Sequence, residues 1–500
     1  MDNPLFLTIS ELSAGLQRQE FSAVDLARTA LDRLASFGRD YNAVASILPE
    51  RALKEAHAAD RMLRDRRDRG ALLGIPYGAK DLLAARGAPT TWGAPPYARQ
   101  VFTYDAAVIE SLRRAGAVLV AKLAMIELAG GGGYRYPSAS LQGPCRNPWN
   151  PDHWSGGSSS GTGAAVAAGL TPFGLGSETS GSILSPSSNC GVTGLRPTYG
   201  LVSRHGAMAL SWTMDKIGPM CRSAEDCGFV LEAIAGPDSR DHASAGRGFQ
   251  MSRGGLRRLS SLRVGYMAEE FEEGVHPTAR VAMREAVSAF RSLGLRWKRI
   301  VLPALPIDAA ARTIIRAEGS TVFKDLIRSG GLARLADRRQ AIGLRAGLQV
   351  TAVDYLSAMR VRRMLQEAFV QIFSAVDVIL APSRYAPAGR IDEPLDPLWR
   401  TRDPGAVRRA RRGVPGGGGV ALVPAGNLVG LPALSLPCGF STTRLPLAVQ
   451  LVGRPFGEDT LIDLGRAYQA ATDWHRRTPP VPWKPIDARS GPKVRPGRST

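Results

Sequence analysis

The sequence has few of the residues that form disulfide frameworks or metal centres. Its 500 residues include only 5 cysteines and 6 histidines. The cysteines are far apart, form no C-x-x-C pair and are odd in number, which argues against a disulfide framework and a zinc site and is typical of a reducing cytoplasm. They are Cys145, Cys190, Cys221, Cys227 and Cys438. We therefore expect no metal and no other cofactor.

Long apolar runs are also missing. The first stretch, MDNPLFLTIS, has no basic region followed by an apolar core, which is what a secretion signal requires. No run of about 18 apolar residues, the length that a membrane-spanning helix needs, occurs elsewhere. We expect a soluble, cytoplasmic protein with no membrane partner.

Acidic residues are outnumbered, since 64 Lys and Arg face 44 Asp and Glu and give a formal net charge of +20. Such a balance raises nucleic acid or an acidic surface as a partner. However, the basic clusters at residues 61–69, 408–412 and 489–498 are separate, and they lack the interleaved aromatic residues of a base-stacking platform. The charge therefore predicts a solvated basic surface and does not favour a nucleic-acid partner.

What the sequence does have is a long stretch rich in Gly and Ser, residues 155–203. Two Gly/Ser clusters, at 156–163 and 176–182, are joined by the apolar run AAVAAGLTPFGL. A flexible linker would not be followed by a segment that must be buried, so we expect a turn that opens a helix at 164–168 and a short strand at 173–176 that leads into a second turn. Backbone N–H groups in such turns form a nest for an oxyanion, which favours a catalytic site.

The rest of the chain alternates helices and strands, which predicts an α/β fold. We expect helices at 7–18, 22–37, 49–69, 105–115, 223–234, 278–293 and 458–475, and a mostly helical segment at 307–373. Thr8, Ser22 and Ser223 are the expected N-caps. We expect strands at 72–84, where the strand itself ends at Gly78, and at 117–122, 261–267, 296–302, 377–382, 433–437 and 447–453.

The same pattern suggests how one large unit is divided along the chain. We expect an N-terminal helical segment packed on the core at 1–70, the core itself at 71–235 and a variable helical segment that forms part of the substrate pocket at 236–420. Residues 421–478 return to the core sheet, and residues 479–500 form a basic tail without a core to join.

Several catalytic chemistries fit the Gly/Ser stretch poorly. Residues 157–161 match G-x-S-x-G, but the preceding PDHWSG is not a strand, as the hydrolase elbow requires. His475 follows Asp473 closely but belongs to a helix that we expect to be exposed, so a Ser-His-Asp triad is poorly supported. No Lys follows the Gly-rich turn for phosphate binding, and no His or carboxylate cluster supports metal-assisted hydrolysis.

Serine chemistry with a lysine base remains. Lys80 lies in the largely apolar segment LLGIPYGAKDLLA. Burial lowers the pKa of a lysine, and the neutral amine can then take the proton of a serine hydroxyl. The N–H groups of the turn at 179–182 can stabilise the tetrahedral intermediate.

At these residues the chain resembles the amidase signature family. The motifs that match, in the order of that family, are GIPYGAKD, GPCRNPW, SGGSSSG, GSETSGSI, CGVTGLRPTYG, DKIGPM and LPLAVQLVGRP. The resemblance extends from about residue 8 to residue 478. It implies a single α/β/α domain with a mixed central sheet, and an enzyme that hydrolyses an amide or releases ammonia from one.

The resemblance also implies roles for individual residues. It makes Ser182 the nucleophile, Ser158 the bridging serine and Lys80 the base, and it implies a cis Gly157–Ser158 peptide bond. It implies oxyanion or substrate contacts at Thr179, Ser180, Gly181 and the N–H of Ser182, and a substrate contact at Ala129. The expected partner is a small-molecule amide, and a homodimer is compatible with the sequence.

The chain departs from the family at three positions. Where relatives often have D-T-G-G-S-I-R, this chain has Glu178, Ser180 and Leu184. Because the three catalytic positions are intact, we interpret the chain as a divergent amide hydrolase. Two alternatives remain: the A component of a glutamine-dependent tRNA amidotransferase, and a non-catalytic binding protein with the same fold. The loss of the arginine after Ile183 argues against a small substrate with a carboxylate.

Overall fold

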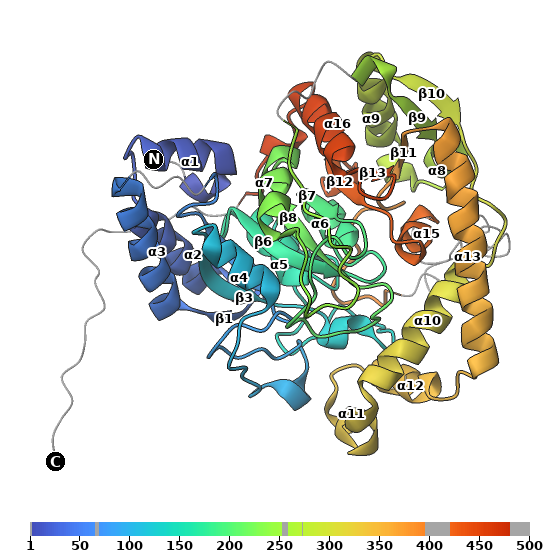
Figure 1. The fold of residues 1–500 in the computed structure, drawn as a ribbon, viewed down its shortest axis with the longest axis horizontal. Helices are drawn as coiled ribbons and strands as arrows, with labels where there is room; N and C mark the ends of the chain where they lie inside the picture. Colours follow the sequence, from blue (N-terminus) through green and yellow to red (C-terminus); the bar gives the residue numbers. More distant parts are fainter. Residues whose placement is uncertain (1–2, 66–69, 253–258, 273, 396–420, 481–500) are drawn as a thin grey trace.

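One large mixed β-sheet forms the centre of the molecule. The computed structural model describes residues 3–65, 70–252, 259–272, 274–395 and 421–480, and these form an 11-stranded sheet with the order β1-β3-β2-β6-β8-β7-β12-β13-β11-β9-β10 (Figure 1). The strands are β1 Val44–Ile47, β2 Pro76–Lys80, β3 Val118–Leu123, β6 Phe173–Glu178, β7 Thr193–Arg196, β8 Lys216–Cys221, β9 Arg263–Tyr266, β10 Arg296–Arg299, β11 Val378–Pro382, β12 Ala433–Phe440 and β13 Pro446–Gly453. The short strands β4 Arg146–Asn147 and β5 Asn150–Trp154 form a separate hairpin.

The sheet has a central run of antiparallel pairs with parallel pairs on both sides of it. Strands β3, β2 and β6 are mutually parallel neighbours, whereas β6, β8, β7, β12 and β13 pair in antiparallel fashion. At the far end β11, β9 and β10 are again parallel. The prediction of a mixed central sheet is therefore confirmed, and β2 and β6, which bear the Lys80 motif and the start of the second Gly/Ser cluster, lie side by side.

Helices cover this sheet. The N-terminal helices are α1 Ile9–Gln17, α2 Ala23–Phe37 and α3 Pro49–Arg64; those that pack near the centre are α4 Ala107–Arg114, α5 Ser160–Ala167, α6 Leu184–Cys190, α7 Ala224–Ile234 and α16 Glu458–Ala470. The remaining helices are α8 Ala268–Glu272, α9 Arg280–Ser292, α10 Ile307–Val322, α11 Lys324–Arg328, α12 Arg338–Gly347, α13 Ala352–Ala375 and α15 Leu422–Leu428.

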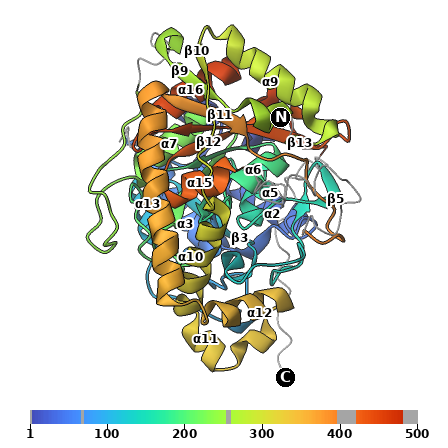
Figure 2. The same ribbon diagram turned by 90° about the vertical axis from the view of Figure 1, so that its right-hand side faces the viewer.

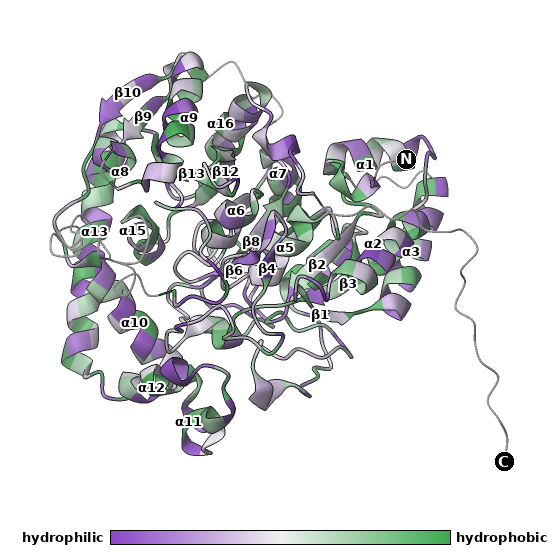
Figure 3. Ribbon diagram, turned by 180° about the vertical axis from the view of Figure 1, so that it is seen from behind, coloured by the Kyte–Doolittle hydropathy of each residue, from purple (hydrophilic) through white to green (hydrophobic). Residues whose placement is uncertain are grey.

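Two groups of helices contact the middle of the sheet. Helices α5 and α6 pack against each other. Helix α5 contacts β2, β3, β6 and β8, and α6 contacts β7, β12 and β13, whereas α7 packs against α4 and α16. Helices α10 to α13 extend along one side of the molecule, where α10 contacts α12, α13 and α15 (Figure 2). The surface helices combine hydrophilic and hydrophobic residues along their length (Figure 3). Among the described residues, no helix has both the length and the apolar character needed to span a membrane.

Local sequence signals explain most of these elements. The Thr8 and Ser22 side chains accept hydrogen bonds from the N–H groups of Glu11 and Asp25, whose carboxylates in turn accept the cap N–H groups. These capping boxes satisfy N–H groups that the first turn leaves unpaired. Helix α7 begins after Ser223, again as predicted.

The strand predictions need correction and addition, because the central strands β7 and β8 and the hairpin strands β4 and β5 were not predicted. Strand β2 does not end at Gly78 but continues to Lys80, because its backbone pairs with β3 as far as the Lys80–Leu123 position. Strand β1 was not predicted; it is only four residues long and joins the edge of the sheet beside β3. The expected C-terminal tail and the basic cluster at 408–412 lie outside the described residues, apart from the tail's first two positions.

Candidate active site

Lys80 is the last residue of β2 and is completely buried between β3 and β6. Its Nζ donates a hydrogen bond of 2.7 Å to Ser158 Oγ and one of 2.9 Å to Ser177 Oγ. A lysine is rarely buried without a carboxylate partner. Here two serine hydroxyls take that place, so the amine is held in a defined position without being fixed as a cation.

The protonation of Lys80 follows from this environment. Burial lowers its pKa from 10.5 to about 7, and the negative charges of Asp215 and Glu178 offset only part of that effect. Because desolvation disfavours the charged form, a substantial fraction of Lys80 is neutral near pH 7. A neutral amine with a serine hydroxyl at hydrogen-bonding distance has the property required of a general base.

Ser158 lies in the turn between the β4–β5 hairpin and α5. Its peptide bond to Gly157 is cis, which confirms the expectation drawn from the family resemblance. A Cβ atom at position 157 would lie 2.7 Å from the Trp154 ring and 2.9 Å from Ile126, so the packing leaves room only for glycine. The Ser158 carbonyl accepts the N–H of Ile126 at 3.1 Å, which fixes the turn from its other side.

Ser182 lies in the second Gly/Ser turn, between the end of β6 and the start of α6. The turn requires Gly181, whose φ of +92° is unfavourable for other residues. The Ser182 carbonyl accepts the N–H of Ser159 at 3.2 Å, and this bond joins the two Gly/Ser turns directly. Ser182 is partly exposed, whereas Ser158 and Lys80 are buried. Such an arrangement leaves Ser182 as the member of the three that a ligand can reach.

Backbone donors are available in the same turn. Among the described residues, no acceptor takes a hydrogen bond from the N–H groups of Ser180, Gly181 or Ser182. The neighbouring Thr179 hydroxyl donates to Asp215 Oδ1 at 2.6 Å, which anchors the start of the turn to the sheet region around β8. Consecutive N–H groups in a rigid turn can bind an oxyanion.

Glu178, the last residue of β6, accepts hydrogen bonds from the backbone at the end of the turn. Its Oε2 accepts the N–H groups of Ile183 at 2.8 Å and Leu184 at 3.0 Å, and its Oε1 accepts Arg196 Nη1 and Asn427 Nδ2, each at 2.8 Å. Burial alone would raise the pKa of Glu178, but the Arg196 charge and these hydrogen bonds hold it below its usual value. The carboxylate is therefore ionised and fixes the residues that directly follow Ser182.

Two cavities border the turn. Cavity A, of about 250 Å³, is lined by Gly157, Ser180 and Gly181 of the two turns and by eight further residues: Tyr134, Trp154, Leu184, Ser185, Ser383, Arg384, Leu395 and Val423. Cavity B, of about 440 Å³, lies beside Ser177, Thr179 and Asp215 and includes Ala129 in its wall. The predicted contact residues therefore do not share one cavity. Ser180 and Gly181 line cavity A, whereas Ala129 and Thr179 line cavity B.

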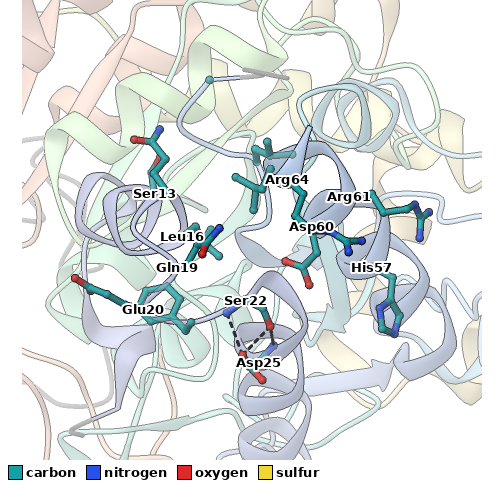
Figure 4. Close-up of a pocket in the computed structure, with 15 residues that line it drawn as sticks. Ser13, Leu16, Gln19, Glu20, Ser22, Asp25, His57, Asp60, Arg61 and Arg64 are labelled. Atoms are coloured by element: carbon teal, nitrogen blue, oxygen red, sulfur yellow. Dashed lines mark hydrogen bonds between the residues drawn. The ribbon is translucent and has the colours of Figure 1, made fainter. Parts of the chain in front are cut away.

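A third and larger cavity, of about 900 Å³, lies between α1, α2 and α3 (Figure 4). Three of its polar side chains, Ser22, Asp25 and Asp60, are already used to cap α2. Asp60 accepts the N–H groups of Ala23 and Val24, and Ser22 and Asp25 bond to each other. Unlike cavities A and B, it is lined by no residue of the two Gly/Ser turns, so its size does not make it the candidate site.

Sequence reasoning missed three members of this arrangement. Ser177 belongs to the predicted motif, but its contact with Lys80 depends on the register between β2 and β6. Arg196 and Asn427 both contact Glu178, and no sequence signal links them to it. His475, expected on an exposed helix, is instead buried, and burial lowers its pKa to about 4. Within the described ranges, no group of three or more His, Cys, Asp and Glu side chains could hold a metal ion.

Comparisons with known proteins agree with this geometry. The model of the family described as Amidase matches residues 25–462. The A component of the glutamyl-tRNA(Gln) amidotransferase from Methylococcus capsulatus is 37% identical over 497 residues, which cover 94% of this chain and 98% of that protein. The native peptide amidase from Stenotrophomonas maltophilia superposes with a TM-score of 0.79 at 29% identity, over 94% of this chain and 98% of that one. A structure described as a vestigial protein complex that reveals the origins of an s-triazine catabolic enzyme superposes with a TM-score of 0.82 at 28% identity, over 93% and 98% of the two chains.

Proposed function

Because the chain belongs to the amidase family, we propose that it is a self-sufficient hydrolase that cleaves the carbon–nitrogen bond of an amide through an acyl-enzyme. The observation that supports this proposal most directly is the 2.7 Å contact between Lys80 Nζ and Ser158 Oγ. Lys80 is fully buried and its pKa is lowered to about 7. Such a lysine can act as a base, which a solvated lysine cannot do near neutral pH.

The proposed cycle begins with Ser182. Its hydroxyl attacks the amide carbonyl while its proton passes to the Ser158 hydroxyl, and Ser158 gives its own proton to the neutral Lys80 amine. Lys80 then returns a proton through Ser158 to the leaving nitrogen, and the carbon–nitrogen bond breaks. A water molecule, deprotonated by the same route, attacks the ester and releases the acid and free Ser182.

The turn supplies the other requirement of this chemistry, which is a place for the negative oxygen of the tetrahedral intermediate. The N–H groups of Ser180, Gly181 and Ser182 are the proposed donors, with Thr179 as the first residue of the turn. Donors fixed before the reaction stabilise the developing charge without reorganising. The bonds from Ile183 and Leu184 to Glu178 support that rigidity.

The first experiment measures labelling of the intact protein by a fluorophosphonate, which reacts with activated serines. We expect one adduct on the wild type, none on Ser182→Ala, and a labelling rate lower by about 100-fold or more on Lys80→Ala, the loss typical of a missing general base. Ser160→Ala is the matched control, because Ser160 is a buried hydroxyl of the same cluster whose hydrogen bond goes to the Ala124 carbonyl and not to Lys80. Unlabelled, folded wild-type protein would contradict the proposal and favour a non-catalytic binding protein.

A second candidate function has one specific observation in its favour. The amidotransferase component from Methylococcus capsulatus matches nearly the whole chain at 37% identity. If this chain has the same role, it should release ammonia from glutamine only together with partner proteins that copurify with it. We expect instead that the purified chain hydrolyses simple amides alone. Glutamine-specific turnover that appears only after such partners are added would favour the amidotransferase.

A further inference from the structure

Cavity A contains one charged side chain among the described residues that line it, namely Arg384. The remaining lining side chains are aromatic, aliphatic or hydroxyl groups. Gly157 of the cis peptide and Gly181 of the nucleophile turn also line it. A group bound to Ser182 that extends into this cavity would therefore share it with a guanidinium.

The position of Arg384 relative to the nucleophile follows from two contacts. Arg384 Nη1 donates to Ser185 Oγ at 3.0 Å. The N–H of Ser185 donates to the Gly181 carbonyl at 2.8 Å, so Ser185, the second residue of α6, lies one turn after Gly181. The guanidinium is thus tied to the first turn of the helix that directly follows the nucleophile turn.

Arg384 also supplies a guanidinium, which the catalytic turn of this chain lacks at position 184. Leu184 stands where the resemblance leads us to expect an arginine, and Leu184 lines cavity A. Arg384 reaches the same cavity from a different element, two residues after β11. The guanidinium in the cavity is therefore carried by the segment that follows β11 and not by the catalytic turn.

We propose that Arg384 is a specificity-determining residue, and that it selects short amides whose acyl group ends in a carboxylate. The proposal rests on the proposed amide hydrolysis. A guanidinium stays charged and pairs with a carboxylate through two parallel hydrogen bonds. Ser185, Ser383 and Tyr134 add hydroxyl groups to the same wall, and because burial raises the pKa of Tyr134 to about 12 its hydroxyl remains a donor.

The size of cavity A limits the acyl group. Its volume of about 250 Å³ is smaller than the lower limit of about 300 Å³ that is usual for pockets that hold drug-sized molecules. A volume of this size suits an acyl chain with only a few carbon atoms between the scissile carbonyl and the carboxylate. The reaction is then that of a dicarboxylic acid monoamide with water: the carbon–nitrogen bond breaks, the water oxygen joins the acyl carbon, and the nitrogen leaves as ammonia.

The test uses protection of Ser182 from the fluorophosphonate, which does not require turnover. Malonamate, succinamate and glutaramate are compared with propionamide, butyramide and valeramide, their neutral partners of equal chain length. For the wild type, we expect at least one acid to halve the labelling rate at a concentration about tenfold or more below that of its neutral partner, as one charge-assisted contact would give. In Arg384→Gln this ratio should fall to near one, and Arg384→Lys should recover part of it.

Arg390→Gln is the matched control. It removes one positive charge from the same segment, but Arg390 is exposed, pairs with Asp392 and does not line cavity A. We expect it to keep the wild-type ratio. Equal protection by acids and neutral amides in a labelled wild type would overturn the role of Arg384 and leave amide hydrolysis intact. The same preference in wild type and Arg384→Gln would also overturn it, whereas a wild type without labelling would overturn both proposals.

Discussion

Lys80 sets the pH range in which the proposed chemistry can operate. Burial lowers its pKa to about 7, and the base is active only when neutral. The rate of Ser182 labelling should therefore be constant above pH 8 and fall about tenfold for each pH unit below pH 6. Measuring the labelling rate between pH 5 and pH 9 checks this dependence.

Lys80→Arg is the variant to compare with this profile. Arginine keeps its proton throughout the range, so we expect no phase of rising rate with pH. A wild-type profile that stays flat from pH 5 to pH 9 would contradict the assignment of Lys80 as the base.

Ser177 is a positioning residue for Lys80. Its hydroxyl accepts a hydrogen bond of 2.9 Å from the lysine, and such a bond stabilises the charged form. We expect Ser177→Ala to lower the labelling rate and to move the midpoint of the pH profile to lower pH. Ser160→Ala should move neither quantity, and a Ser177→Ala profile with an unchanged midpoint would limit Ser177 to a structural role.

The predictable part of the site was the part that lies close together in sequence or within recognisable motifs. Lys80 stands out because a charged residue in an apolar strand needs an explanation, and Ser158 and Ser182 lie in matching Gly/Ser turns. The contact of Ser177 with Lys80 could not be predicted, because it requires Gly78 of β2 to pair with Gly174 of β6. A shift of one residue in this register would turn Ser177 to the opposite face of the sheet.

At the scale of secondary structure, the buried pair of Glu178 and Arg196 joins β6, β7 and the start of α6. Both side chains are completely buried. Removing one partner leaves an unpaired buried charge, which costs about 3–5 kcal/mol. We expect that loss in the free energy of unfolding for Glu178→Gln and for Arg196→Met, measured by chemical denaturation.

The double variant tests whether the two charges act as a pair. Because it leaves no uncompensated charge, its loss should be clearly smaller than the sum of the two single losses. The rate of Ser182 labelling in the double variant should nevertheless stay below that of the wild type. The neutral amide that replaces the Glu178 carboxylate accepts weaker hydrogen bonds from the N–H groups that follow Ser182. Additive losses of stability would contradict the pairing.

Helix α13 offers a prediction that concerns stability alone. Thr351 caps it by accepting the N–H of Asp354, and the Asp354 carboxylate accepts the N–H of Thr351. Thr351→Ala should lower the free energy of unfolding by about 1 kcal/mol, the usual value for such a cap. The labelling rate should stay unchanged, because the cap is not part of either cavity at the turn.

Caps of this kind explain why the starts of α1, α2 and α7 were predicted and several short strands were not. A capping box is encoded within four residues, as Ser22 and Asp25 illustrate. Strand β1 has only four residues, all of them partly exposed. Its existence depends on the edge of β3, to which it pairs across more than 70 residues of sequence.

At the scale of the whole molecule, the specificity of tRNA binding distinguishes the two candidate functions, because the net charge of +20 by itself supports only non-specific binding. We expect the purified chain to bind tRNA only non-specifically, so its affinity should fall steeply as salt rises from about 50 to 200 mM and should not differ between tRNA species. Filter binding or fluorescence anisotropy measures this dependence. Preference for one tRNA at about 200 mM salt would favour the amidotransferase instead.

The mixed sheet was predictable because the family motifs are spread along most of the chain. The alternation of strands and helices also agrees with the structure, from the strand at 117–122 to those at 433–437 and 447–453. The sequence could not predict which distant segments complete the site. Arg384 follows β11, and its approach to Ser185 depends on the whole order of strands between β6 and β11.

The bond from Asn427 to Glu178 has a consequence for the order in which the protein is made. Asn427 follows Glu178 by 249 residues. A ribosome that has translated Lys80, Ser158 and Ser182 has therefore not yet translated the last side chain that secures the turn. Domains form as their chain emerges, so we expect a nascent chain that stops before Asn427 to have all three proposed catalytic side chains and yet remain unreactive. Hydrolytic activity would then begin only after Asn427 has been translated.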